Sequence, residues 1–287
     1  MCERGYNETM KDINEERKKQ NISSNIEDAK TEKILQRIKK LRLLDDDFMT
    51  VCFENNKEAT ELVLNIILKK NNIIVEEVHT QHAIKNISGR SVRLDIYATD
   101  TDNKKYNIEI QREDKGAGAK KARYNSSIMD SNIIPAGSDV EDLPETFVIF
   151  ITENDVIGKG KPMYHIDRHI EETGEYFHDG SHIIYVNAST SEDTPLGQLM
   201  HDFRVTNANE MHNKVLADTV RHFKEDEEGV KNMSKIIEEL VEEERVEEKF
   251  EIVENFLRLG TVSITDIAKA TGLSEEQVLK IKKEMES

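Results

Sequence analysis

Residues 91–111, SVRLDIYATDTDNKKYNIEIQ, decide the fold, because they have the pattern of two antiparallel strands joined by a short loop. Both strands alternate β-branched or aromatic residues with polar ones, which is the period of a strand with one buried face. Pairing through a three-residue loop, residues 101–103, would place Asp95 opposite Glu109 on one face of the sheet. Asn103 tolerates the left-handed backbone that this loop requires, whereas a slip by one residue would separate the two carboxylates.

Two facing carboxylates repel each other unless a cation lies between them. Hard oxygen ligands at this spacing suit Mg²⁺ or Mn²⁺, and such an ion could bind a scissile phosphate and lower the pKa of a bound water. The backbone carbonyl of Ile110 is a further candidate ligand, and Gln111 is a candidate for orienting the attacking water. The alternative is that Asp95, Glu109 and Gln111 line the solvated face of an ordinary sheet.

The segments around this hairpin predict an α/β fold. Apolar residues recur at helical spacing within residues 31–70, and the run TFVIFIT at 146–152 is typical of a strand buried on both faces. The other expected elements are three strands over 73–112, a helix over about 117–132, a hairpin over 163–187, two helices between about 195 and 224, and an acidic helix that ends at Gly260.

Charge is spread unevenly along the chain. The 287 residues carry a net charge of −17, which disfavours contact with nucleic-acid phosphates. Residues 223–249 hold eleven acidic and five basic side chains, whereas residues 111–124 hold five basic and two acidic ones. Because local potential governs binding, a nucleic-acid site near residues 111–124 is compatible with this composition.

The cysteines and the apolar runs indicate where the protein resides. Cys2 and Cys52 have no paired spacing, which favours a reducing compartment. No apolar run approaches the roughly 20 residues that cross a bilayer, and the charged N-terminus lacks the apolar core of a secretory signal. We therefore expect a cytoplasmic protein with no membrane association.

Three segments carry a resemblance to a known family: RLDIYATDTDNKKYNIEIQR, KKARYNSSIMDSNII and LPETFVIFIT, in that order. They resemble the core of the PD-(D/E)XK nuclease family transposases, also described as recombination-promoting nucleases, and the resemblance extends over roughly residues 41–280. It implies a restriction-endonuclease-like α/β core, a mixed sheet flanked by helices, with a helical C-terminal extension. It also implies an endonuclease that cleaves DNA with Mg²⁺ (or Mn²⁺), linked to recombination or transposition.

The family motif falls on Asp95, Glu109 and Gln111 as catalytic residues, and the resemblance implies that Asp95, Glu109 and the carbonyl of Ile110 hold the metal. Two positions depart from the superfamily name, since Leu94 stands in place of its proline and Gln111 in place of its lysine. Glutamine there is similar to what this family shows, but it cannot serve as a general base.

Three more residues are candidates for the site. A further acidic residue often comes from the first core helix, and we select Glu61, although a solvated helix face would explain it equally well. Lys120 and Arg123, in the basic segment, are the expected phosphate contacts. DNA is the expected partner, and a homodimer is left open.

We expect four parts along the chain. These are a mobile or helical arm over 1–40, a nuclease-like domain over 41–222, an acidic connecting helix over 223–260 and a helix-turn-helix-like tail over 261–287. Ser263 and Ser274 each begin a capping box in the tail. Glu275 and Glu276 begin its second helix, where they would repel phosphates, so packing or assembly is favoured over sequence reading.

Two other functions are compatible with these residues. One is a non-catalytic DNA-binding or regulatory protein with a decayed nuclease core. The intact trio of Asp95, Glu109 and Gln111 argues against decay, and the acidic start of the tail helix argues against DNA binding by the tail. The other is a nuclease that acts on RNA, and no feature of the sequence separates RNA from DNA.

Overall fold

The structure is a computed structural model that describes residues 30–85, 90–112, 114–135 and 137–285. The described residues separate into two compact units, one formed by residues 39–226 and the other by residues 30–38 together with residues 227–285. The first unit contains the whole sheet and every residue that the sequence places in the site.

A six-stranded mixed sheet forms the centre of the larger unit, in the order β1-β2-β3-β4-β6-β5. Neighbours from β1 to β3 are antiparallel, β3, β4 and β6 are parallel, and β5 is antiparallel to β6. The strands are β1 Val75–Ile84, β2 Val92–Asp100, β3 Lys105–Gln111, β4 Thr146–Thr152, β5 Met163–Ile166 and β6 Ser181–Asn187.

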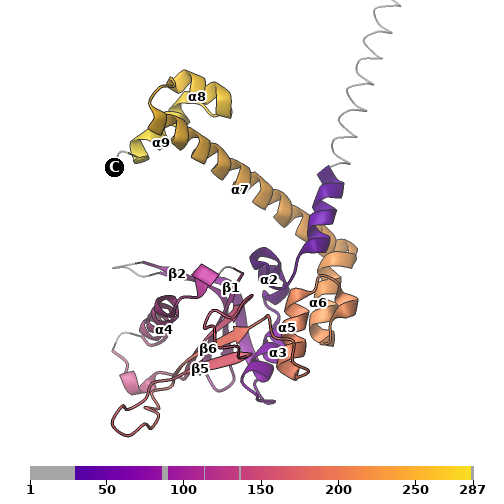
Figure 1. The fold of residues 1–287 in the computed structure, drawn as a ribbon, viewed down its shortest axis with the longest axis vertical. Helices are drawn as coiled ribbons and strands as arrows, with labels where there is room; N and C mark the ends of the chain where they lie inside the picture. The colour runs from indigo at the N-terminus through magenta and orange to yellow at the C-terminus, as the bar shows by residue number, and fades with distance from the viewer. Residues whose placement is uncertain (1–29, 86–89, 113, 136, 286–287) are drawn as a thin grey trace, which may run out of the picture. The chain divides into compact units, whose positions relative to one another are not determined.

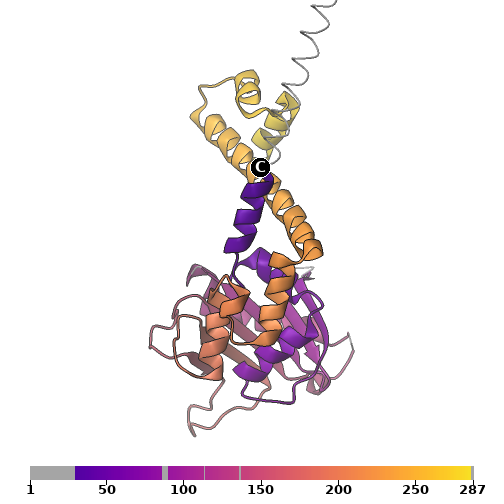
Figure 2. The ribbon, with the colours of Figure 1, turned by 90° about the vertical axis from the view of Figure 1, so that its right-hand side faces the viewer.

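Helices cover both faces of this sheet. One layer lies on one face (Figures 1 and 2) and contains α2 Asp46–Phe53, α3 Lys57–Ile67, α5 Pro195–Arg204 and α6 Lys214–Glu225. The opposite face is covered by α4, Ala119–Ile133 (Figure 1), and the short helices are η1 Asp114–Ala117, η2 Val140–Asp142 and η3 Ala208–Glu210. The expected fold class, a mixed sheet flanked by helices with a helical C-terminal extension, is confirmed.

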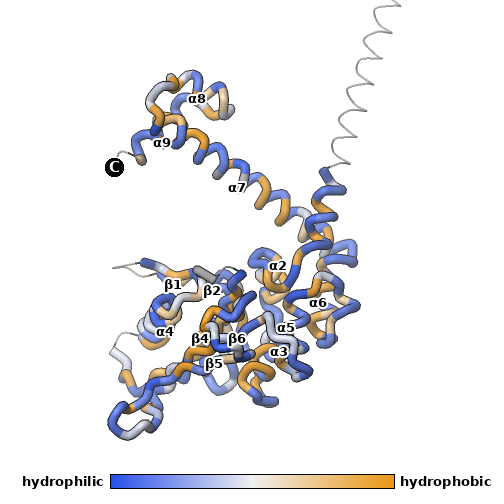
Figure 3. Tube along the Cα trace, in the orientation of Figure 1, coloured by the Kyte–Doolittle hydropathy of each residue, from blue (hydrophilic) through white to orange (hydrophobic). Residues whose placement is uncertain are grey.

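Strand β4 is buried along its entire length. It lies between β3 and β6 and is parallel to both, so neither of its edges reaches solvent. The hydropathy drawing shows it as an apolar segment of the sheet (Figure 3). This position explains why the residues between the two terminal threonines of TFVIFIT are all apolar instead of alternating with polar ones.

The β2–β3 hairpin has the register that the three-residue loop predicts. Ile96 pairs with Ile108 and Thr99 with Lys105, and Asn103 adopts the left-handed conformation with φ of 62°. The alternation along β2 is not regular, however. Leu94 and Tyr97 both pack in the cluster beneath α4, although residues three apart in a regular strand would face opposite sides.

In its described part, the second unit consists of helices joined by short loops. Residues 30–38 are helical, and the acidic segment forms α7, Glu227–Leu259, which ends before Gly260 (φ 65°). Its tail contains α8, Ile264–Thr271, and α9, Glu275–Met285. Apolar residues of α8 and α9 pack against the last turns of α7, in a cluster of Val253, Ile267, Ala268, Val278 and Ile281.

Both tail helices begin as the sequence predicts. The Ser263 hydroxyl accepts a hydrogen bond from the Asp266 backbone N–H at 3.1 Å. At the second helix, Ser274 and Gln277 satisfy each other's backbone N–H groups at 2.9 and 3.2 Å. Among the described residues, no helix is both long enough and apolar enough to cross a bilayer.

Candidate active site

Asp95 and Glu109 come together where β2 and β3 stop pairing. The backbone ladder ends at Ile96 and Ile108, and one step further the Asp95 carboxylate accepts a hydrogen bond from the Ile110 N–H at 2.8 Å. Burial and the negative charge of Glu109 raise the pKa of Asp95 to about 7, although the Ile110 hydrogen bond acts in the opposite direction. Two acidic side chains are therefore held close together with little solvent to screen them.

The Glu109 carboxylate is fully buried in the sheet, on the side that α4 covers. One of its oxygens lies 2.8 Å from the ammonium group of Lys121 on α4. That ammonium group also lies 5.6 Å from the centre of the Phe150 ring on β4, within reach of a cation–π interaction. The other carboxylate oxygen has no hydrogen-bond partner in the described part of the chain, so the burial of this charge is only partly compensated.

Gln111 lies next to the turn that leads into α4. A Cβ atom added to Gly116 would come within 1.7 Å of the Gln111 side-chain oxygen, so the carboxamide packs directly on the glycine backbone. Any side chain at position 116 would displace it. The absence of a side chain at Gly116 therefore helps to define where the Gln111 amide lies.

Glu61 does not join this cluster. Its carboxylate accepts a hydrogen bond from the backbone N–H of Val75 at 2.8 Å. Val75 pairs with Asp100, which lies five residues from Asp95, or about 17 Å along β2. The helical spacing predicted that Glu61 lies on a polar helix face. In the structure this side chain fixes the start of β1.

Asp46, which the sequence analysis did not select, is a further acidic residue whose charge acts on Asp95. It is exposed at the start of α2, and its negative charge contributes to the raised pKa of Asp95. The Gln81 side-chain amide donates a hydrogen bond to Asp46 at 2.9 Å. In the sequence, the acidic run at residues 45–47 was the feature that could have indicated Asp46. Such a run is ambiguous, because acidic side chains are also stabilised at helix N-termini by the helix dipole.

The family model described as PD-(D/E)XK nuclease family transposase matches residues 51–258. The chain belongs to this family. The match includes the Asp95–Glu109 hairpin, α4 and β4, and it ends before α8 and α9. The chain matches no curated protein and no solved structure.

As in PD-(D/E)XK nucleases generally, a divalent metal is the cofactor to test against these residues. Within the described ranges, no three His, Cys, Asp or Glu side chains group closely enough to hold a metal ion by themselves. Mg²⁺ does not require such a cage, since it is commonly bound by one or two carboxylates, with water and substrate phosphate completing its shell. Asp95 and Glu109, with one buried oxygen lacking a partner, fit that kind of site.

Lys120 and Arg123, the expected phosphate contacts of this transposase-family chain, are both exposed on α4. They flank Lys121, the residue that contacts Glu109. In the structure the basic segment lies beside Glu109, but the sequence could not show which of its lysines contacts that carboxylate. That is decided by the packing of Ala122, Ile128 and Met129 beneath α4.

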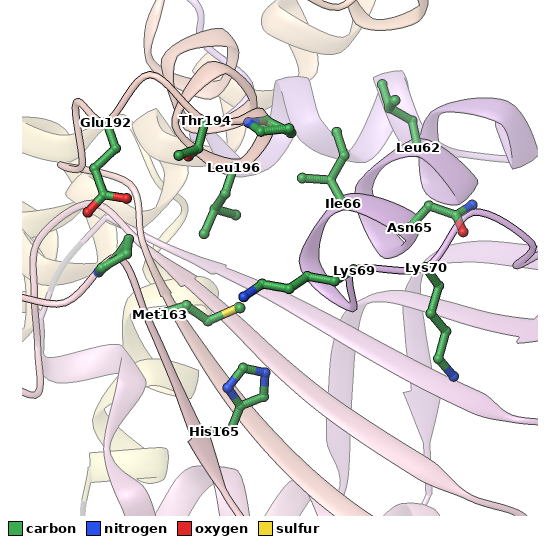
Figure 4. Close-up of a pocket in the computed structure, with 12 residues that line it drawn as sticks. Leu62, Asn65, Ile66, Lys69, Lys70, Met163, His165, Glu192, Thr194 and Leu196 are labelled. Atoms are coloured by element: carbon green, nitrogen blue, oxygen red, sulfur yellow. The ribbon is translucent and has the colours of Figure 1, made fainter.

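A separate pocket of about 690 Å³ lies on the other face of the sheet (Figure 4). Its lining includes Lys69, Met163 and His165. On β6, Ile183 and Tyr185 pack beneath α4, so the residues between and after them, Ile184 and Val186, face the opposite side of the sheet. His165 and Met163 pair with Ile184 and Val186 and face that side too. The pocket is therefore not part of the Asp95–Glu109 site.

Proposed function

We propose that the chain is a Mg²⁺-dependent endonuclease that hydrolyses phosphodiester bonds in DNA. The observation that supports this most directly is the pair of carboxylates at Asp95, which is half-buried, and Glu109, which is fully buried; they lie close together, with Lys121 beside Glu109. Repulsion between them makes the metal-free site unfavourable, and a divalent cation would relieve it. Membership of a nuclease family supports the same chemistry.

In this proposal Asp95, Glu109 and the carbonyl of Ile110 hold Mg²⁺, or Mn²⁺ in its place, and Asp46 adds charge from α2. A bound cation would offset charge on the phosphate and lower the pKa of a water, so that the hydroxide formed from it could attack the phosphorus. The Gln111 carboxamide orients that water by hydrogen bonding. Gln111 cannot also act as the general base, because its amide does not take up a proton. The deprotonation is therefore left to bulk solvent or to a phosphate oxygen.

Lys121 takes the role of the lysine that the superfamily motif places on the strand, at the position where this chain has Gln111. Its ammonium group reaches Glu109 from α4 and would lie beside the scissile phosphate once that carboxylate is shared with the cation. Lys120 and Arg123 contact phosphates further along the DNA. The family suggests a biological setting in recombination or transposition, in the cytoplasm.

The proposal is tested by incubating supercoiled plasmid DNA with the protein and MgCl₂. Wild type should nick or linearise the DNA, and EDTA should abolish this. Asp95→Asn and Glu109→Gln should lose roughly 100-fold or more of the rate, whereas Glu76→Gln, which changes an exposed carboxylate on β1, should retain it. Cleavage that survives in Glu109→Gln would contradict the proposal, and cleavage of RNA alone would replace DNA as the substrate.

A further inference from the structure

Two histidine side chains of β1 lie on the same face of the sheet although they are three residues apart. In a regular strand, His79 and His82 would face opposite sides. Between them, Gln81 has a φ of 51°, in the left-handed region. Its side chain donates a hydrogen bond to Thr50 of α2 at 3.1 Å, and the hydroxyl of Thr80 also bonds to a residue at the end of α2. Two consecutive side chains therefore face α2, and both histidines are left on the side that α4 covers.

These histidines form a row of stacked rings with Tyr97 of β2. The rings of His82 and Tyr97 have centroids 4.8 Å apart and are within 14° of parallel, and those of His79 and His82 are 6.2 Å apart and within 26°. Tyr97 packs against the cluster beneath α4, His82 is half-buried and His79 is exposed. Burial and the neighbouring His79 lower the pKa of His82, so its ring is uncharged near pH 7. The row runs from the core to solvent, and its middle ring is neutral.

The ring pair of His82 and Tyr97 lines a cavity of about 350 Å³ between the edge strand β1 and the second half of α4. The rest of its lining combines apolar side chains with one amide and one ammonium group at exposed positions: Ala83, Ile84, Lys85, Met129, Asn132 and Ile133. Aromatic and apolar walls with a small number of polar groups are typical of a site for a small ligand. Since aromatic rings stack on one another, a flat ring is the ligand that this lining favours.

The cavity lies near the proposed cation site. Tyr97 is two residues from Asp95, or about 7 Å along β2, and His82 pairs with Leu94, the residue before Asp95. Successive nucleotides of a DNA strand rise by roughly 3.4 Å each, so a base about two nucleotides from the scissile phosphate is within reach. A base inside a duplex is held in its stack, whereas an unpaired or flipped base can stack on aromatic side chains of a protein.

We propose that this cavity is a subsite for one unpaired nucleobase of the DNA substrate, held against the ring pair of His82 and Tyr97. The subsite rests on the proposed function, because it assumes that DNA is cleaved at Asp95 and Glu109. It adds a requirement on the substrate, namely that a base next to the cleaved bond is unpaired. The alternative is that the rings only pack against one another, and binding measurements separate the two.

The test is binding of a single-stranded oligodeoxynucleotide to the full chain, measured by fluorescence anisotropy in the Glu109→Gln background so that cleavage does not interfere. His82→Ala should raise the dissociation constant about tenfold, within the range that one base–aromatic contact contributes. Because the ring removed is neutral, the slope of log affinity against log salt should stay the same. His82→Phe, which restores a ring, should bind as the parent does. His165→Ala removes an exposed histidine on the opposite face of the sheet and is the matched control.

An oligonucleotide of abasic sites identifies the group that is bound. The parent protein should bind it about tenfold more weakly than the intact oligonucleotide, and His82→Ala should show a much smaller difference, because base and ring act as a pair. Equal binding of the two oligonucleotides by the parent would overturn the subsite. So would an unchanged dissociation constant in His82→Ala, or a His82→Phe variant as weak as His82→Ala. Absence of Mg²⁺-dependent plasmid cleavage by the wild type would instead contradict the proposed function.

Discussion

The ammonium group of Lys121 lies 2.8 Å from a carboxylate oxygen of Glu109, and the carboxylate is buried while the lysine is about 40% exposed. The pair joins α4 to β3 at the point where the chemistry is expected.

Replacing Lys121 with methionine keeps an apolar stem over Phe150 but leaves Glu109 without its cation. We expect the metal-free protein to lose about 1–3 kcal/mol of unfolding free energy, less than for a fully buried pair because Lys121 is partly exposed. Added Mg²⁺ should restore part of this loss, and cleavage should fall strongly. Chemical denaturation with and without MgCl₂ measures the effect, with Lys120→Met as the control. Equal stability of the two variants would show that the ion pair is not formed in solution.

The raised pKa of Asp95 predicts a pH dependence of stability. Because the folded-state pKa is about 7 and the ordinary value is 3.8, the folded protein binds more protons than the unfolded chain between these values. The contribution of Asp95 to the unfolding free energy is therefore greatest at low pH and declines as pH rises from about 4 to about 7. In metal-free buffer, Asp95→Asn should remove this decline relative to wild type. A parallel pH profile for the two proteins would contradict the assignment.

Lys120 and Arg123 predict a change in salt dependence. If both contact phosphates, the double alanine variant should bind DNA more weakly, and the slope of log affinity against log salt should become shallower by about 2. Binding is measured in the Glu109→Gln background, so that cleavage does not interfere. Lys57→Ala, at an exposed position on α3, should leave the slope unchanged. An unaltered slope in the double variant would assign both residues to a solvated helix face.

Deleting residues 261–287 separates the role of the tail from that of the core. The deletion removes α8 and α9 and uncovers Val253 on α7. If the tail serves packing or assembly, Mg²⁺-dependent nicking should persist while solution mass or thermal stability changes. Relaxed cleavage specificity at unchanged mass would instead indicate that the tail reads sequence, despite Glu275 and Glu276 at the start of α9.

Several features of the larger unit follow from local sequence. The register of the β2–β3 hairpin was predictable because the loop length fixes it and Asn103 tolerates the required backbone. The burial of β4 was predictable because an uninterrupted apolar run needs cover on both faces. Both features depend on residues that are near neighbours in the chain.

The remaining parts of the site depend on contacts between distant segments. The helical spacing shows that Glu61 lies on a polar face of α3. The end of the sheet that its side chain reaches depends on how α3 packs against β1. The inward turn of Lys121 depends on the rotation of α4, which its apolar residues set against β4 and β6. The left-handed conformation of Gln81 has no local signal at all, since glutamine is not a residue that favours it.

The complete burial of β4 has a consequence for how the protein is produced. Its seven residues combine high β-propensity with no charge and no proline, which is the composition of segments that aggregate when exposed. One edge can pair with β3 as soon as β4 has been synthesised, but the other edge has no partner until residues 181–187 have left the ribosome. Rapid overexpression at high temperature should therefore favour inclusion bodies, and slow synthesis in the cold should favour soluble protein.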